Sequence, residues 1–309
     1  MISQLLLYKI LQLAVFMMFG FVLVKLKVIK SSDSTVLSKI SLYLLMPAAL
    51  INSFDVELTS QVAKGIALSF GAAIFLHFLL LGVDFAYKKV FNGTSVERTS
   101  IIYSNAANLI IPIVSYVLGE EWVIYSCAFM SVQIVFLWTH AIGLFSSEKK
   151  FNYKKIILNT NIIAVAVGVV MLVSGVRLPV FAREITSSLS GMLGVVAMII
   201  AGMLATTVDF KNVFVNKRLY LVLAMRLVVC PLIVLAVIKI ALAFISISNA
   251  SAILLISFMA SITPPAATIT QFAQIHNMDA DFAVAINIAA TILCIATMPI
   301  FVYLYQILI

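Results

Sequence analysis

Two apolar segments of this sequence each combine proline with small, neutral polar side chains. Residues 104–112 read Ser-Asn-Ala-Ala-Asn-Leu-Ile-Ile-Pro, and residues 261–268 read Ser-Ile-Thr-Pro-Pro-Ala-Ala-Thr. Proline has no backbone N–H and clashes with the carbonyl one helical turn before it, so we expect one helix to break near Pro112 and another near Pro264 and Pro265. Neither segment contains a catalytic serine-histidine-aspartate set, paired aspartates or a metal-binding histidine motif. These residues therefore favour reversible binding.

Broken helices offer partial charges without any ionised side chain. The second halves would begin near Ile113 and Ala266, and a helix N-terminus carries unpaired N–H groups and about half a positive charge, which favours an anion. The C-terminal carbonyls of the first halves would bind a cation next to that anion. We expect neutral hydrogen bonds to a carboxylate from Asn105, Asn108, Gln133, Thr263 and Asn287.

The composition places both segments in a membrane. Apolar residues make up 63% and charged residues 10% of the 309 residues, compared with about 45–50% and about 25% in soluble domains. A helix needs about 20 apolar residues to cross the hydrocarbon core, and freed main-chain groups there must face protein or a water-filled cavity. The fold we predict is a single all-α membrane domain over residues 1–309, with ten transmembrane helices at 5–24, 35–54, 64–87, 99–118, 122–146, 157–174, 186–207, 218–244, 251–274 and 281–307.

Basic residues concentrate in every second connection. The first, third, fifth and seventh loops hold most of the lysine and arginine, so we expect these loops in the cytoplasm and both termini on the other side. The net charge of +8 then reflects membrane orientation, and no nucleic-acid partner is expected. The basic connection at 146–155 separates five helices from five, which predicts two inverted repeats, 1–147 and 156–309, and alternating access. Helices four and nine occupy corresponding positions, so their breaks are the expected site.

Two charged residues lie inside predicted helices, where charge is costly. Arg226 in helix eight would either extend to the cytoplasmic headgroups or face a cavity and attract anions. Asp84, near the cytoplasmic end of helix three, would be its partner or a proton-coupling carboxylate. The three cysteines are isolated from one another, so we expect no cofactor or metal centre. Na⁺ and H⁺ stay open as coupling ions, as does uncoupled transport.

Several short motifs along the whole chain resemble the auxin efflux carrier family, which includes plant auxin exporters and bacterial carriers thought to move malonate. The motifs are Leu44-Leu45-Met46-Pro47-Ala48, Asn105 seven residues before Pro112, Arg226 followed by Pro231, the Pro264/Pro265 pair, and Ala290-Thr291-Ile292-Leu293 leading to Met298-Pro299. Ala107 and Ile110 stand where glycines are usual in that family.

The resemblance implies a fold related to the bile acid/sodium symporters, with helices four and nine crossing at their prolines. It further implies a scaffold of helices in 5–54 and 157–207, a transport domain of helices in 64–146 and 218–307, and a small carboxylate held at the crossing. Carried over by residue, Asn105, Pro112 and Pro264 or Pro265 match the crossing motif, and Gln133 would line the site.

The leading hypothesis is a secondary active or facilitative transporter that moves a small organic anion by an elevator form of alternating access. A sodium- or proton-coupled symporter of another small solute and a channel are the alternatives, and an enzyme ranks last. We expect the anion and the lipid bilayer as partners, a homodimer as the candidate assembly, and the bacterial cytoplasmic (inner) membrane as the location.

Overall fold

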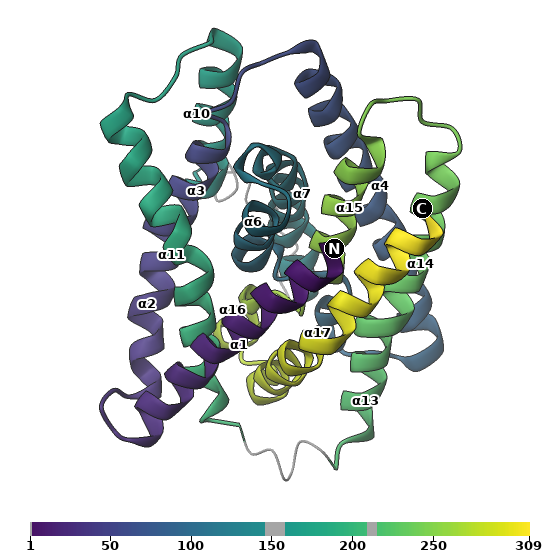
Figure 1. Ribbon diagram of the computed structural model, residues 1–309. Coiled ribbons are helices and arrows are strands. Elements are labelled where there is room, and N and C mark those ends of the chain that lie inside the picture. The colour runs from purple at the N-terminus through teal and green to yellow at the C-terminus, as the bar shows by residue number, and fades with distance from the viewer. Residues whose placement is uncertain (1, 146–157, 209–214) are drawn as a thin grey trace.

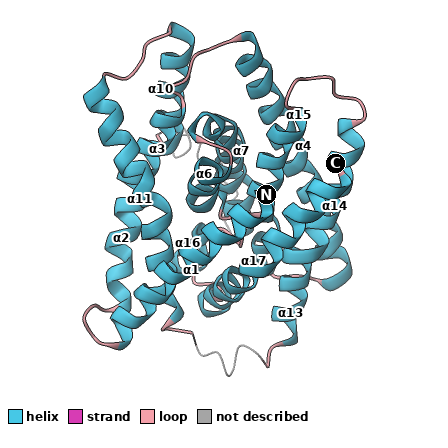
Figure 2. Ribbon diagram, viewed as in Figure 1, coloured by secondary structure: helices cyan, strands magenta, loops and turns pink. Residues whose placement is uncertain are grey.

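The structure, a computed structural model, describes residues 2–145, 158–208 and 215–309. Within these ranges every regular element is a helix (Figure 2). The helices are α1 (Ile2–Lys25), α2 (Ser34–Ile40), α3 (Met46–Ser53), α4 (Ser60–Phe91), α5 (Ser95–Ile102), α6 (Ala106–Val117), α7 (Val123–Phe136), α8 (Ile142–Phe145), α10 (Thr160–Ser174), α11 (Val180–Ala205), α13 (Lys217–Ala224), α14 (Cys230–Leu242), α15 (Ala250–Ile262), α16 (Ala267–Ile275) and α17 (Ala280–Leu308). The basic connection at 146–155 lies outside the described residues.

Seven helices in the described ranges are long and apolar enough to cross a membrane, three of them assembled from shorter helices joined by a π turn. The π turn Ser41–Leu45 joins α2 to α3, and Met225–Val229 joins α13 to α14. Pro47 and Pro231 follow these two turns. A π turn widens the helix locally, which accommodates a proline without ending the helix. Shorter apolar helices lie at Asn108–Val117, Thr160–Ser174 and Ala250–Ile262.

Large apolar side chains lie exposed on the outside of the bundle. On α4, Phe75, Phe78 and Phe85 are 57%, 61% and 70% exposed, and Val173 on α10 is 70% exposed. A soluble protein rarely presents so much apolar surface, whereas hydrocarbon tails are a suitable environment for it. The exposure pattern therefore agrees with helices that face lipid.

In Figure 1, α2, α3, α10 and α11 form one side of the molecule and α4, α13 and α14 the other, with α6, α7, α15 and α16 between them. Helix α1 packs closely on α11. A Cβ atom on Gly20 would lie 2.1 Å from the Ile199 carbonyl oxygen, and one on Gly202 would lie 1.8 Å from that of Met17. Only glycine permits this approach of two backbones, a contact common between membrane helices.

The helix breaks agree only in part with the sequence-based expectation. The second break is confirmed, since α15 ends at Ile262 and α16 begins at Ala267, with Pro264 and Pro265 between them. The break expected at Pro112 is wrong, because α6 starts at Ala106 and continues through Pro112 to Val117. The first interruption is instead at residues 103–105, seven or more residues earlier. A proline inside a helix removes one hydrogen bond, and here that loss does not end α6.

Candidate functional site

The two interrupted helices meet through their main chains. The Asn105 N–H donates to the Pro264 carbonyl at 2.7 Å, and the Ala266 N–H donates to the Tyr103 carbonyl at 2.9 Å. Ser104 and Pro265 lie opposite each other in this short antiparallel bridge. The pairing supplies partners for main-chain groups that no helix satisfies, as the membrane interior requires. The α5–α6 and α15–α16 interruptions therefore cross each other, and we call this place the crossing.

Two side-chain amides bind the main-chain groups of Ser104 and Pro265, which the bridge itself leaves without partners. Gln133 on α7 accepts from the Ser104 N–H at 3.0 Å and hydroxyl at 2.7 Å, and its Nε2 donates to the Ser104 carbonyl at 2.8 Å. Asn287 on α17 donates from Nδ2 to the Pro265 carbonyl at 2.7 Å. Because Pro265 has no N–H, one donor satisfies it, whereas Ser104 needs both a donor and an acceptor.

Arg226 lies behind the crossing with none of its surface exposed. Its guanidinium donates to the carbonyls of Thr263, Ser261 and Ile101, with Nη2 2.8 Å from the Ser261 oxygen and Nη1 2.9 Å from the Ile101 oxygen. The expectation that it reaches the headgroups or faces a cavity is wrong, as is its expected pairing with Asp84. Its partners are carbonyls freed at the helix interruptions, and Asp84 pairs with Arg98 instead.

Asp84 forms a separate polar cluster with α5 and the π turn Leu137–Ala141. Arg98 forms a bidentate ion pair with it, with Nε 2.8 Å from Oδ1 and Nη2 2.6 Å from Oδ2. His140 Nε2 lies 3.6 Å from Oδ2, and His140 Nδ1 lies 2.9 Å from the Tyr103 hydroxyl. Tyr103 belongs to the crossing through its carbonyl. The cluster therefore connects a buried ion pair to the bridge.

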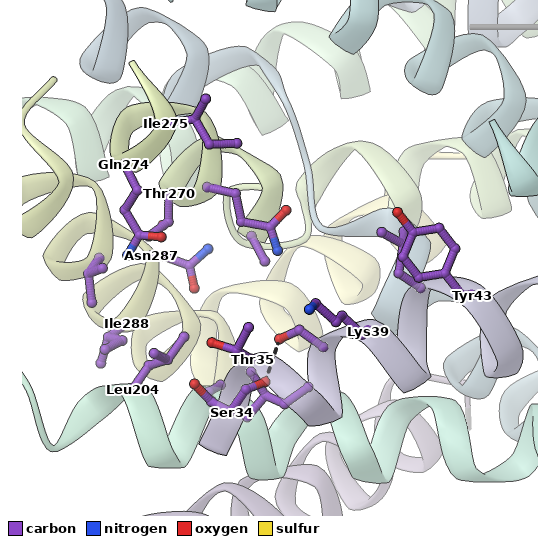
Figure 3. Close-up of a pocket in the computed structure, with 17 residues that line it drawn as sticks. Ser34, Thr35, Lys39, Tyr43, Leu204, Thr270, Gln274, Ile275, Asn287 and Ile288 are labelled. Atoms are coloured by element: carbon purple, nitrogen blue, oxygen red, sulfur yellow. Dashed lines mark hydrogen bonds between the residues drawn. The ribbon is translucent and has the colours of Figure 1, made fainter. Parts of the chain in front are cut away.

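Three adjoining cavities reach the crossing from one end of the bundle. The innermost, about 110 Å³, is lined by residues that include Ser104, Asn105, Asn108, Gln133, Thr268 and Asn287. A cavity of about 360 Å³ lies between α2, α11, α16 and α17 (Figure 3). A third, of about 530 Å³, is more apolar and includes Met46, Trp138 and Phe272. Leu42 and Gln271 line all three, and their combined size suits a small organic molecule.

Within the part of the chain that the structure describes, Lys39 is the only charged residue that lines these three cavities. In Figure 3 it points from α2 toward the polar side chains of α16 and α17, where Thr270 and Asn287 lie. The first turns of α6 and α16 also border the innermost cavity, through Asn105 and Ala266. Helix N-termini and an ammonium group both favour negative charge, so the electrostatics suit an anion.

Sequence reasoning missed Lys39, although a signal was present. The residue falls inside the predicted helix 35–54, and an ionisable residue within a membrane helix is a functional candidate by default.

The structure brings together some of the predicted site residues and separates others. Those that line the innermost cavity are Asn105, Asn108, Gln133, Ala266 and Asn287. Thr263 is fully buried and binds Arg226. Ile113 and Pro264 border a different, apolar cavity of about 30 Å³. Pro112 packs on α11, where a Cβ atom at Gly194 would lie 2.8 Å from its Cγ. Pro265 contributes its carbonyl to the bridge.

Comparison with known proteins identifies the family. The family described as membrane transport protein matches residues 5–302, nearly the whole chain. The chain therefore belongs to this transport family, which is of the auxin efflux carrier type, and its apolar helices make it an integral membrane protein. A comparison with curated protein sequences finds no significant match.

Proposed function

We propose that this protein is a secondary transporter of a small organic anion, which it holds in the cavities at the crossing. One observation carries the proposal: the lining combines two helix N-termini, neutral amides and Lys39, and none of the described residues in it is a carboxylate. Neutral amides orient a carboxylate without binding it too tightly to leave. The apolar wall beside them accommodates the hydrocarbon part of the solute.

The placement of the cavities supports alternating access as the mechanism of the proposed transporter. If each interrupted pair, α5–α6 and α15–α16, counts as one span, these two spans, α10 and the seven long helices add up to ten. This count supports the proposed arrangement of two inverted repeats, residues 1–147 and 156–309. The cavity of Figure 3 lies between α2 and α11 on one side and α16 and α17 on the other. In the proposed mechanism the first pair belongs to the scaffold and the second pair to the transport domain. Movement of the transport domain against the scaffold would then expose the bound anion to each side of the membrane in turn, just as one bundle moves against another in inverted-repeat carriers. The close α1–α11 contact supports a rigid scaffold.

The basic loops support one orientation of the proposed transporter in the membrane. The cavities open near the start of α2 and the end of α11, beside residues 25–30 with three lysines. Because positively charged loops stay in the cytoplasm, we place this opening on the cytoplasmic side, with both termini outside and the protein in a bacterial inner membrane.

The experiment is uptake into proteoliposomes that contain the purified protein. Radiolabelled monocarboxylates, dicarboxylates and amino acids are offered with and without the same unlabelled solute trapped inside. We expect saturable uptake of one class of carboxylate, accelerated by trapped solute. Uptake of amino acids alone, or flux that does not saturate, would contradict the proposal.

Lys39 provides a matched series for the same assay. Lys39→Gln should raise KM at least about fivefold, because an attraction of about 1 kcal/mol at 4 Å is lost, while Lys39→Arg keeps most of the affinity. Lys64→Gln removes an equal charge from the exposed start of α4, away from the cavities, and should leave KM unchanged. An equal KM for Lys39→Gln and Lys64→Gln would show that Lys39 does not contribute to binding of the anion.

A further inference from the structure

Arg226 is a buried, charged residue that has no role in the proposed binding of the anion. The side chain projects from the π turn Met225–Val229 and is 0% exposed. Among the ion pairs of the described residues, none includes it. A buried charge persists only where fixed dipoles or an opposite charge stabilise it. Its stabilisation must therefore come from the groups that its nitrogens contact.

Those groups are main-chain carbonyls at the ends of two helices. Ile101 lies in the last turn of α5, and Ser261 and Thr263 lie at the end of α15. All three carbonyls accept from the guanidinium. The last carbonyls of a helix have no intrahelical partner and carry about half a negative charge. Arg226 thus neutralises the C-terminal ends of the first halves of both interrupted helices at once.

This environment is the kind that membrane carriers offer to a coupling cation. Unwound carbonyls and half-helix C-termini coordinate Na⁺ at the broken helices of several transporters. Here the same groups already surround a positive charge. A second unit charge about 4 Å from the guanidinium would bind about a thousandfold more weakly at an effective dielectric constant near 20.

We propose that Arg226 is the resident cation of the crossing and makes the protein independent of Na⁺. The guanidinium fills the position that a coupling ion would take between the ends of α5 and α15, and it moves with the transport domain instead of exchanging with solvent. The proposal deepens the proposed function, on which its transport measurement rests, but its binding consequence can be measured without any solute. Replacing the fixed charge by a neutral group should create a site for Na⁺.

The test is thermal unfolding of the purified protein in detergent, in NaCl and in choline chloride at equal ionic strength. The unchanged protein and Arg226→Lys should each melt at the same temperature in both salts. Arg226→Gln should melt lower than the unchanged protein in choline chloride, and NaCl should raise its melting temperature by about 3 °C or more through binding to the vacated carbonyls. Counterflow by the unchanged protein should run at equal rates in both salts.

Arg218→Gln is the matched control. Arg218 also donates to a carbonyl at a helix end, that of Phe91 at 2.9 Å, but its side chain is 45% exposed, so its loss should create no dependence on Na⁺. A melting temperature of the unchanged protein that rises in NaCl overturns the proposal, as does folded Arg226→Gln that responds equally to both salts. If Arg226→Gln does not fold, the unchanged protein and Arg226→Lys still decide between Na⁺ dependence and independence. Absence of any carboxylate uptake would refute the proposed function and leave the melting result standing.

Discussion

Replacing Gln133 with leucine removes a single side chain that satisfies three polar groups of Ser104. The Gln133 side chain is buried at 2% exposure, and a leucine in its place offers no polar atom to Ser104. Leucine is similar in size but leaves the Ser104 N–H and carbonyl without the partners they have at 3.0 and 2.8 Å. Each unsatisfied buried group costs about 1–3 kcal/mol. The crossing should lose about 2–6 kcal/mol of its conformational free energy.

The assay measures counterflow and melting temperature for the same preparation. A loss of 2 kcal/mol corresponds to about a 30-fold lower population of the paired crossing, so we expect counterflow to fall by about that factor or more. Ser104→Ala removes only the hydroxyl that donates to Gln133 at 2.7 Å. This change should destabilise the crossing by about 1 kcal/mol or less.

Ser131→Ala is the control within α7. Its hydroxyl is buried but bonds only to the Cys127 carbonyl of its own helix, at 2.6 Å, so its removal should change neither transport nor stability appreciably. The reasoning would be refuted if Gln133→Leu transported like Ser131→Ala, or if Ser104→Ala were as severe as Gln133→Leu.

Three further substitutions test separate parts of the site. Asn105→Ala leaves the main-chain bridge intact but removes an amide from the innermost cavity. Counterflow should therefore fall at least about tenfold, as expected for loss of an orienting hydrogen bond, while the melting temperature stays unchanged. A full counterflow rate would exclude Asn105 from solute binding. Pro112→Ala should leave the crossing in place because α6 already passes through Pro112, and an altered KM would contradict this. Asp84→Asn strands the Arg98 charge and should lower stability by about 3–5 kcal/mol, measured by thermal unfolding; an unchanged melting temperature would show that the pair contributes nothing.

The sequence allowed prediction of the two interruptions and of their mutual contact, but it misplaced one of them. Proline marks a missing hydrogen bond, and Pro264 and Pro265 in succession leave a helix no way to continue. Pro112 stands alone, and its helix tolerates it. The actual interruption at Ser104 and Asn105 depends on partners more than 150 residues away in the chain, at Pro264 and Ala266. Short polar side chains favour non-helical backbone there, yet they do so equally in many intact helices.

The charged residues show a second limit of prediction from the sequence. Composition identified Arg226 and Asp84 as costly within a membrane, and that cost is real, but the partners of each come from tertiary structure. Arg226 binds carbonyls, which every residue carries and which no sequence pattern distinguishes. Lys39 was counted as part of a membrane helix, although its place at the cavity follows from the packing of α2 against α16 and α17.

The bridge between Ser104 and Pro265 is made of peptide groups, and this affects how the protein can change over time. Gln133, Asn287 and Arg226 bind main-chain groups at or beside this bridge. Substituting other neighbouring side chains leaves the path of the two chains, and hence the donors and acceptors at their meeting point, largely as they were. Descendants of such a protein could exchange most of the surrounding residues, and with them the preferred cargo, while inheriting the same main-chain architecture. Solute preference would then diverge faster than the transport cycle itself.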